Sequence, residues 1–275
     1  MGGQIELGFK SDNSGEVVFG GPAPEFRVDG RKIEVYARHA QFGSVAVGQG
    51  DMASNGTAEE DLSGTYVAGY SQVRFAAASL VFGPGTNAPA VKQVFNNFDG
   101  LHRDDRVRYD TPAWRGVTAA VSVAGEEFHD AALRHHLNVG PHEIASALAY
   151  ARKGAGVDQY SGSCSLRLGC GLSFTAAMGG QDVAADRSPL SFYGKAGYRF
   201  DLFSCGETRL AVDYSRNKEI AQADDVAESM AIIVVQCVEP LSSELYATVR
   251  RYSLDRSDEA CDDLVLFMSG VRFCF

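Results

Sequence analysis

The chain has 275 residues, a formal net charge of −10 at pH 7 and a sequence pI near 5.1. A nucleic-acid-binding protein is not expected, because neutralising phosphates requires a clustered excess of Lys and Arg. The most apolar uncharged stretch, AIIVVQCV at 231–238, is much shorter than the ~20 residues of a transmembrane helix, which excludes a helical membrane protein.

Alternation of apolar and polar residues is the dominant pattern and begins near the N-terminus. In QIELGFK (4–10), Ile5, Leu7 and Phe9 alternate with more polar residues, and GLSFTAAMG (171–179) repeats the arrangement. A period of two residues indicates β-strands with one apolar and one polar face. Helical periodicity is almost absent, so the sequence predicts an all-β fold.

About fourteen strands are predicted in this way. Their approximate ranges are 2–10, 30–38, 42–49, 104–110, 116–124, 128–137, 143–152, 157–167, 171–180, 191–200, 207–215, 227–236, 243–253 and 263–275. The connections alternate between short turns, such as HAQ and NVGPH, and connections that are longer on average, above all the segment 50–103. This layout is typical of an antiparallel up-and-down transmembrane β-barrel.

The last strand, within DDLVLFMSGVRFCF (262–275), shows how the two faces would be used. Counting back from Phe275, alternate residues through Phe273 and Val271 are apolar or small and would face lipid, whereas Arg272 between them would face the interior. Aromatic residues at the strand end would lie at the membrane interface. A soluble sandwich also alternates, because one face of each sheet is core, so a soluble all-β binding or structural protein is the alternative interpretation.

Four stretches contain sequence motifs that are more specific than the alternation of apolar and polar residues. They are GRKIEVYARHAQFGSVAVGQGDMASNGTAEEDLSGT (30–65), NNFDGLHRDDRVRYDTPAWRGVTAAVSVA (96–124), SFYGKAGYRFDLFSCGETRLAVDYSRNKEIAQADDVAES (191–229) and ELYATVRRYSLDR (244–256). FG-x-V-x-V-G-Q before a long loop and RVRYDTP before the next strand are each moderately specific, and together they are strong. The chain resembles, in order and over nearly its whole length, the general diffusion porins of Gram-negative bacteria, most closely the alphaproteobacterial type.

The resemblance implies a function and an assembly. It implies an outer-membrane channel, not an enzyme, through which small hydrophilic solutes and ions diffuse passively. It also implies a homotrimer of barrels with about 16 strands each, surrounded by outer-membrane lipid. The chain would be a single barrel domain over 1–275, with 50–103 folded inward as a constriction loop. Phe273 and Phe275 resemble the signal that the outer-membrane assembly machinery reads.

Three features depart from the family pattern. Only three predicted strands precede the long loop, where the family has five. The N-terminus, MGGQIELGFKSDNSG, has no basic region followed by an apolar stretch, so no signal peptide is visible. Cys274 beside the terminal Phe and His135 within a strand are also unusual for the family. From the first two departures we expect a sequence that starts after the signal peptide and the first two strands; read without the resemblance, the missing signal peptide also allows a cytosolic protein.

Passive diffusion requires no nucleophile, so the expected functional residues are charged groups around a water-filled constriction. The loop would supply the acidic groups and the opposite wall the basic ones, producing a field across the pore. The acidic candidates are Asp51, Glu59, Glu60, Asp61 and Asp99. The basic candidates are Lys32, Arg38, Arg106, Arg108, Lys195 and Arg199. The alternative interpretation, without a role in the pore, is that the acidic groups belong to a solvated loop and that the paired arginines protect a strand edge.

Motifs of catalysis and metal binding are not recognised. The sequence contains no H-E-x-x-H and no G-x-S-x-G, and GPGTNAP (83–89) lacks the Lys of a phosphate-binding loop. No metal site or cofactor is therefore expected, although DDVAE (224–228) and DEACDD (258–263) could bind Ca²⁺ through oxygen ligands. An outer-membrane enzyme acting on lipid or peptide is a third hypothesis.

Overall fold

The computed structural model describes residues 1–10, 26–83, 88–154, 156–183, 187–257 and 260–274, and in this part of the chain fourteen strands form one antiparallel sheet. The strands are β1 (Gly2–Lys10), β2 (Arg27–His39), β3 (Gly43–Asp51), β4 (Arg103–Asp110), β5 (Val117–Ala124), β6 (Phe128–Val139), β7 (His142–Lys153), β8 (Val157–Arg167), β9 (Leu172–Asp182), β10 (Leu190–Phe203), β11 (Gly206–Lys218), β12 (Val226–Val238), β13 (Ser243–Asp255) and β14 (Leu264–Phe273). Each strand pairs with the next along the chain, as the predicted meander requires. The alternation in the sequence located all fourteen to within a few residues.

Helix is confined to short segments in the described ranges. The helices η1 (Val73–Ala76) and α1 (Val91–Val94) lie between β3 and β4, and η2 (Glu239–Leu241) lies between β12 and β13. None of the described helices is long and apolar enough to span a bilayer.

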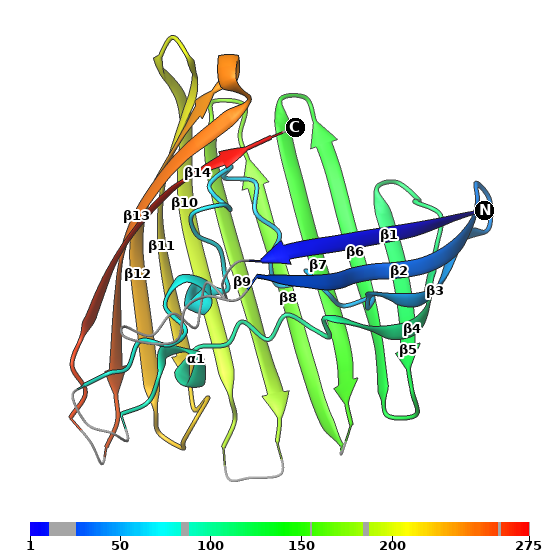
Figure 1. Ribbon diagram of the computed structural model, residues 1–275, viewed down its shortest axis with the longest axis horizontal. Helices are drawn as coiled ribbons and strands as arrows, with labels where there is room; N and C mark the ends of the chain where they lie inside the picture. Colours follow the sequence, from blue (N-terminus) through cyan, green and yellow to red (C-terminus); the bar gives the residue numbers. More distant parts are fainter. Residues whose placement is uncertain (11–25, 84–87, 155, 184–186, 258–259, 275) are drawn as a thin grey trace.

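The sheet curves strongly, and its first and last strands form the two free edges (Figure 1). Over the described residues, no pairing joins β1 to β14, so the sheet is not closed. The expectation of a closed barrel is therefore not met in this structure. The sheet has fourteen strands, whereas the family resemblance implied about 16.

The two faces of the sheet have opposite polarity. Along β11, Val212 is 52% exposed on the convex face, whereas its neighbour Asp213 is 3% exposed on the concave face. Phe267 and Phe273 on β14 are likewise exposed, at 66% and 59%. A soluble sandwich would bury these rings between two sheets. The single sheet with an apolar outside therefore does not favour the soluble alternative.

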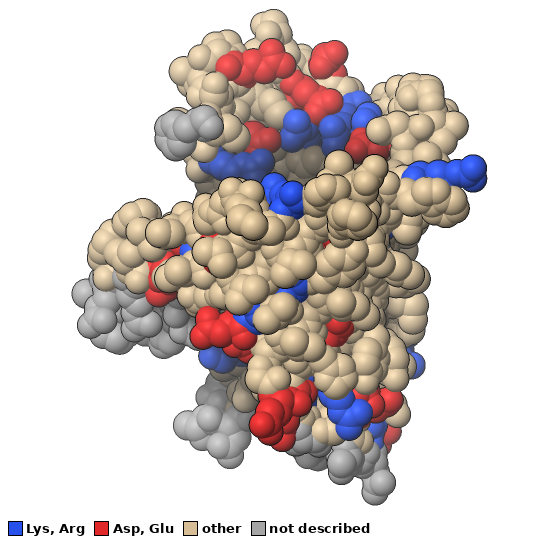
Figure 2. All heavy atoms as spheres, turned by 90° about the vertical axis from the view of Figure 1, so that its right-hand side faces the viewer, with Lys and Arg blue, Asp and Glu red and all other residues tan. Residues whose placement is uncertain are grey.

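Viewed from its β1–β5 side, the molecule shows a band of largely uncharged surface (Figure 2). Acidic and basic side chains gather above the band, around a hollow, and again below it. A bilayer requires this distribution, because its hydrocarbon core excludes charge while its interfaces accept it.

The core lies between the concave face and the long segment that follows β3. Phe82 and Phe95 from this segment are buried in one cluster with Tyr252 of β13, and the rings of Phe95 and Tyr252 meet edge to face at 5.6 Å. The segment approaches the sheet closely at Gly179 of β9. A Cβ at that position would lie 2.7 Å from Phe98 Cβ, so glycine makes the contact possible.

Candidate functional site

The described residues of the segment 52–102, between β3 and β4, run across the inside of the curved sheet (Figure 1). Near the start of this segment, the Ala53 amide donates a hydrogen bond to Ser122 Oγ on β5 at 2.8 Å. Farther along, the Val73 carbonyl accepts one from Tyr252 Oη on β13 at 2.8 Å. The segment is therefore fixed to the inner face of strands that span most of the sheet.

Alternate serines of β8 form a row of anchors for the segment. Ser161, Ser163 and Ser165 share the concave face because side chains alternate along a strand. Ser163 Oγ accepts a hydrogen bond from the Glu60 amide at 3.0 Å, and Ser165 Oγ accepts one from the Leu62 amide at 2.9 Å. These serines were not among the residues predicted from the sequence, although their spacing in SGSCS (161–165) was a visible signal.

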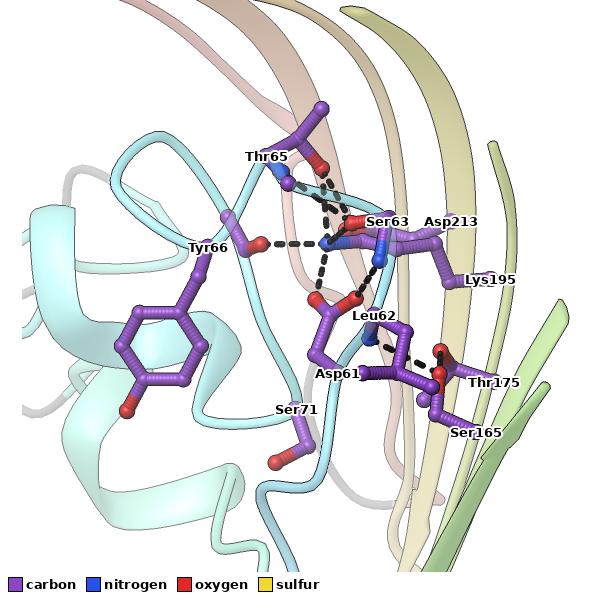
Figure 3. Close-up of polar contacts among 12 residues, drawn as sticks. Asp61, Leu62, Ser63, Thr65, Tyr66, Ser71, Ser165, Thr175, Lys195 and Asp213 are labelled. Carbon is purple, nitrogen blue, oxygen red and sulfur yellow. Dashed lines mark hydrogen bonds and ion pairs between the residues drawn. The ribbon is translucent and has the colours of Figure 1, made fainter. Parts of the chain in front are cut away.

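Lys195 of β10 makes several buried polar contacts with the segment (Figure 3). Its Nζ lies 2.6 Å from Asp61 Oδ2, 2.9 Å from Thr65 Oγ1 and 2.6 Å from the Gly69 carbonyl oxygen. The Lys195 and Asp61 side chains are 0% and 3% exposed. Both were predicted as site residues that face each other across a water-filled constriction. Instead they form a buried ion pair, and their hydrogen-bond donors and acceptors have partners.

Two further arginines reinforce this side of the sheet. Arg199 donates from Nη2 to the Leu62 carbonyl at 2.6 Å and from Nε to the Ser63 carbonyl at 3.1 Å. Arg199 therefore also holds the segment instead of facing its carboxylates. Arg250 of β13 forms a bidentate pair with Asp213 of β11, at 2.8 and 2.7 Å, and neither residue was predicted from the sequence.

Asp51 is placed at the junction of β3 and the segment. It lies 2.6 Å from Lys32 Nζ and 2.9 Å from Arg103 Nε. Arg108 of β4 donates to the Met52 carbonyl at 3.0 Å. The predicted residues Asp51, Lys32 and Arg108 are thus brought together where the segment leaves the wall.

The wall formed by β1–β4 carries the remaining basic candidates. Arg106 Nη2 lies 2.5 Å from Glu34 Oε2. The Arg38 guanidinium carbon lies 4.4 Å from the centre of the Tyr36 ring. Arg38 and Arg106 line, with Lys32, Arg108 and Asp51, an open polar cavity of about 360 Å³.

Glu59 and Asp99 lie close enough within the segment for their charges to interact. Glu59 accepts a hydrogen bond from Tyr66 Oη at 2.7 Å, and Asp99 accepts bonds from the amides of Gly56 and Ala58 at 2.7 and 2.8 Å. Burial, together with the nearby charge of Asp99, raises the pKa of Glu59 to about 7. Burial also raises the pKa of Asp99, against the lowering effect of its amide hydrogen bonds.

The other predicted residues occupy separate places. The Glu60 carboxylate lies 3.8 Å from His136 Nε2, at the inner wall. Phe273 is exposed at the end of β14, and Phe275 falls outside the described residues. None of Glu59, Glu60 and Asp99 lines the polar cavity beside Asp51.

The two acidic runs considered for Ca²⁺ differ in what can be said of them. In 224–228, the Asp225 carboxylate is engaged by Arg256 at 2.6 and 2.9 Å. The run 258–263 lies partly outside the described residues. No group of three or more His, Cys, Asp or Glu arranged for a metal occurs in the described part of the chain. Calcium binding stays a prediction.

Comparisons with known proteins agree with this architecture. A sequence model of the Gram-negative porin family matches residues 1–257. A loop-deletion form of OmpT from Vibrio cholerae aligns with a TM-score of 0.57 and 12% identity, covering 90% of this chain and 80% of that one. An anion-selective porin from Comamonas acidovorans aligns with a TM-score of 0.51 and 16% identity, covering 88% and 75%. No curated protein matches the sequence.

An outer-membrane β-barrel channel is the class of protein that the inverted sheet and its polar interior define. The family match covers most of the chain, so the chain belongs to the Gram-negative porins. It is an outer-membrane protein through which small solutes and ions diffuse passively, and it is not an enzyme. The resemblance in the sequence is thereby confirmed.

Proposed function

We propose that residues 50–103 are the constriction of this channel, within one barrel domain over 1–275. The observation that carries the proposal is the fixed position of the segment inside the sheet, held by the buried pair of Lys195 and Asp61. A segment held in this way narrows the water-filled space, so solutes are filtered by size and charge.

The wall of β1–β4 supports a selective role for the remaining space. Its cavity is lined by four basic side chains (Lys32, Arg38, Arg106 and Arg108) and three acidic ones (Glu34, Asp51 and Asp110). The local balance is therefore basic, although the whole chain carries −10. Charges farther away than the Debye length of ~8 Å are largely screened, so the wall decides the sign of selectivity. A weak preference for anions follows.

Membrane insertion adds a requirement. Unpaired backbone amides cost several kcal/mol each in hydrocarbon, so the free edges of β1 and β14 must be paired in the bilayer. We also propose that the protein is a homotrimer in outer-membrane lipid. The family resemblance and the apolar convex face support this assembly.

Planar-bilayer recording of detergent-purified protein tests the proposal. Folded protein should give ohmic conductance that closes in three equal steps, and a KCl gradient should give a reversal potential of the anion-selective sign. Silence from protein that is folded by circular dichroism would contradict the channel. Single-step closure would contradict the trimer alone, and a cation-selective potential would contradict the role of the wall.

A further inference from the structure

The cavity on the concave face of β1–β4 has the form of a groove along β3. The inward residues of β3 are small, namely Ser44, Ala46 and Gly48. Larger side chains stand on the two neighbouring strands, and the register sets them in rows. Arg38, Ser44 and Asp110 form one row, and Tyr36, Ala46 and Arg108 form the next. With neighbouring strands ~4.8 Å apart, Arg38 and Asp110 flank a floor two strand spacings wide.

Three ion pairs join all but one of the charged residues that line the groove, and Arg103, which does not line it, also lies 2.9 Å from Asp51. The pairs are Lys32 with Asp51 at 2.6 Å, Arg106 with Glu34 at 2.5 Å and Arg108 with Asp110 at 2.7 Å. The remaining charged lining residue is Arg38. Its guanidinium lies over the Tyr36 ring, and it has no carboxylate partner among the described residues.

The shape and charge of the groove suit one class of solute. A guanidinium can bind a carboxylate through two parallel hydrogen bonds, and here the aromatic face of Tyr36 supports it from one side. Among the lining residues, Arg38 is the one charge without an ion-pair partner in the described part of the chain, and it matches one negative charge on a solute. A dianion would place its second charge near the carboxylates of Glu34 and Asp110, which already have partners.

We infer that this groove is a binding site for small monoanionic carboxylates on their way through the channel. The carboxylate binds Arg38, and the body of the solute lies over Ser44 and Ala46. The cavity of about 360 Å³ holds on the order of ten water volumes, which fits an organic acid of similar heavy-atom number. The site deepens the proposed function, because it would give the anion preference a specific location.

Direct binding tests this inference without any need for conduction. Sodium lactate is titrated into detergent-folded protein and followed by saturation-transfer NMR, with glycerol as the neutral probe and succinate as the dianion. One exposed ionic contact predicts a dissociation constant on the order of millimolar. Lactate should bind, succinate should bind no more tightly, and glycerol should not saturate.

Matched variants locate the site. Arg38→Gln should weaken lactate binding at least tenfold, and Arg38→Lys should weaken it less because the charge remains. Arg115→Gln is the control, since Arg115 is also an exposed arginine over an aromatic ring, 5.1 Å from the centre of Trp114, and lies outside the groove. It should leave binding unchanged.

Three outcomes would overturn the inference. They are undiminished lactate binding by Arg38→Gln, tighter binding of succinate than of lactate, and a conducting wild-type protein that binds no lactate. Lactate binding that depends on Arg38 in a protein that does not conduct would instead preserve the groove and refute the channel.

Discussion

The buried contact of Lys195 with Asp61 gives the sharpest test of how the proposed constriction is held. Lys195→Met keeps the length of the side chain and removes its ammonium group, which donates to Asp61, Thr65 and Gly69. Asp61 would then be a buried carboxylate without its cation. Breaking such a pair by removing one partner costs about 3–5 kcal/mol. Both side chains are almost unexposed, so solvent screening reduces this cost little.

The cost should fall on docking of residues 52–102 rather than on the sheet. The strand ladders around Lys195 do not depend on its side chain, since β10 pairs continuously with β9 and β11. At 1.4 kcal/mol per tenfold, the equilibrium between docked and undocked segment should shift by roughly a hundredfold to a few thousandfold. Single-channel records should show a larger or strongly fluctuating conductance.

Two variants complete this experiment. Asp61→Asn combined with Lys195→Met removes both charges and should recover part of the loss, because no uncompensated ion remains. Lys218→Met is the matched control, since Lys218 is exposed at the end of β11. Unchanged conductance and unchanged protease protection of the segment in Lys195→Met would refute the anchoring role.

Three more predictions address the loop, the lipid face and the wall. The pKa of Glu59 is raised to about 7 from its usual 4.5, so its stabilisation of the docked segment is complete below about pH 4.5 and is lost as the pH rises through about 7. Conductance fluctuations should therefore increase from pH 5 to pH 8, and a pH dependence that persists in Glu59→Gln would assign the effect elsewhere. Val212→Arg places a charge on the convex face and should destabilise the protein in lipid vesicles by about 2–4 kcal/mol, seen as a lower urea midpoint; an unaltered midpoint would argue against lipid contact there. Arg106→Ala combined with Arg108→Ala should shift the reversal potential toward cations, and an unchanged potential would remove these two residues from the selectivity determinants.

The strands were predictable because one constraint governs them all. A strand between hydrocarbon and water must alternate, and a shift of one residue would turn every side chain to the wrong face. β11 illustrates this, with Leu210, Val212 and Tyr214 outward and Asp213 inward. The lack of pairing between the described strands β1 and β14 could not be predicted from the pattern of any single strand. Closure depends on strand number and curvature and not on local pattern.

The acidic and basic residues of the candidate site were selected by type and by face, and four of them, Lys32, Arg38, Arg106 and Arg108, line one cavity. Their function in the pore stays a prediction. Contacts between residues more than a hundred positions apart, such as Lys195 with Asp61, depend on the path of the segment, which the sequence pattern does not encode.

The apolar residues of the long segment explain where water can pass. An acidic loop suggests a solvated segment, yet Phe82, Phe95 and Phe98 are buried, and Phe82 and Phe95 pack in one cluster with Tyr193 and Tyr252 of the sheet. Elsewhere on the concave face, Ser163 and Lys195 bond to the segment and Arg250 bonds to Asp213. Because this part of the concave face is occupied, the solute path that we propose follows the opposite wall, where small side chains of β3 leave a polar groove. In this proposal, the packing that fills one side of the interior directs solutes past Arg38 on the other.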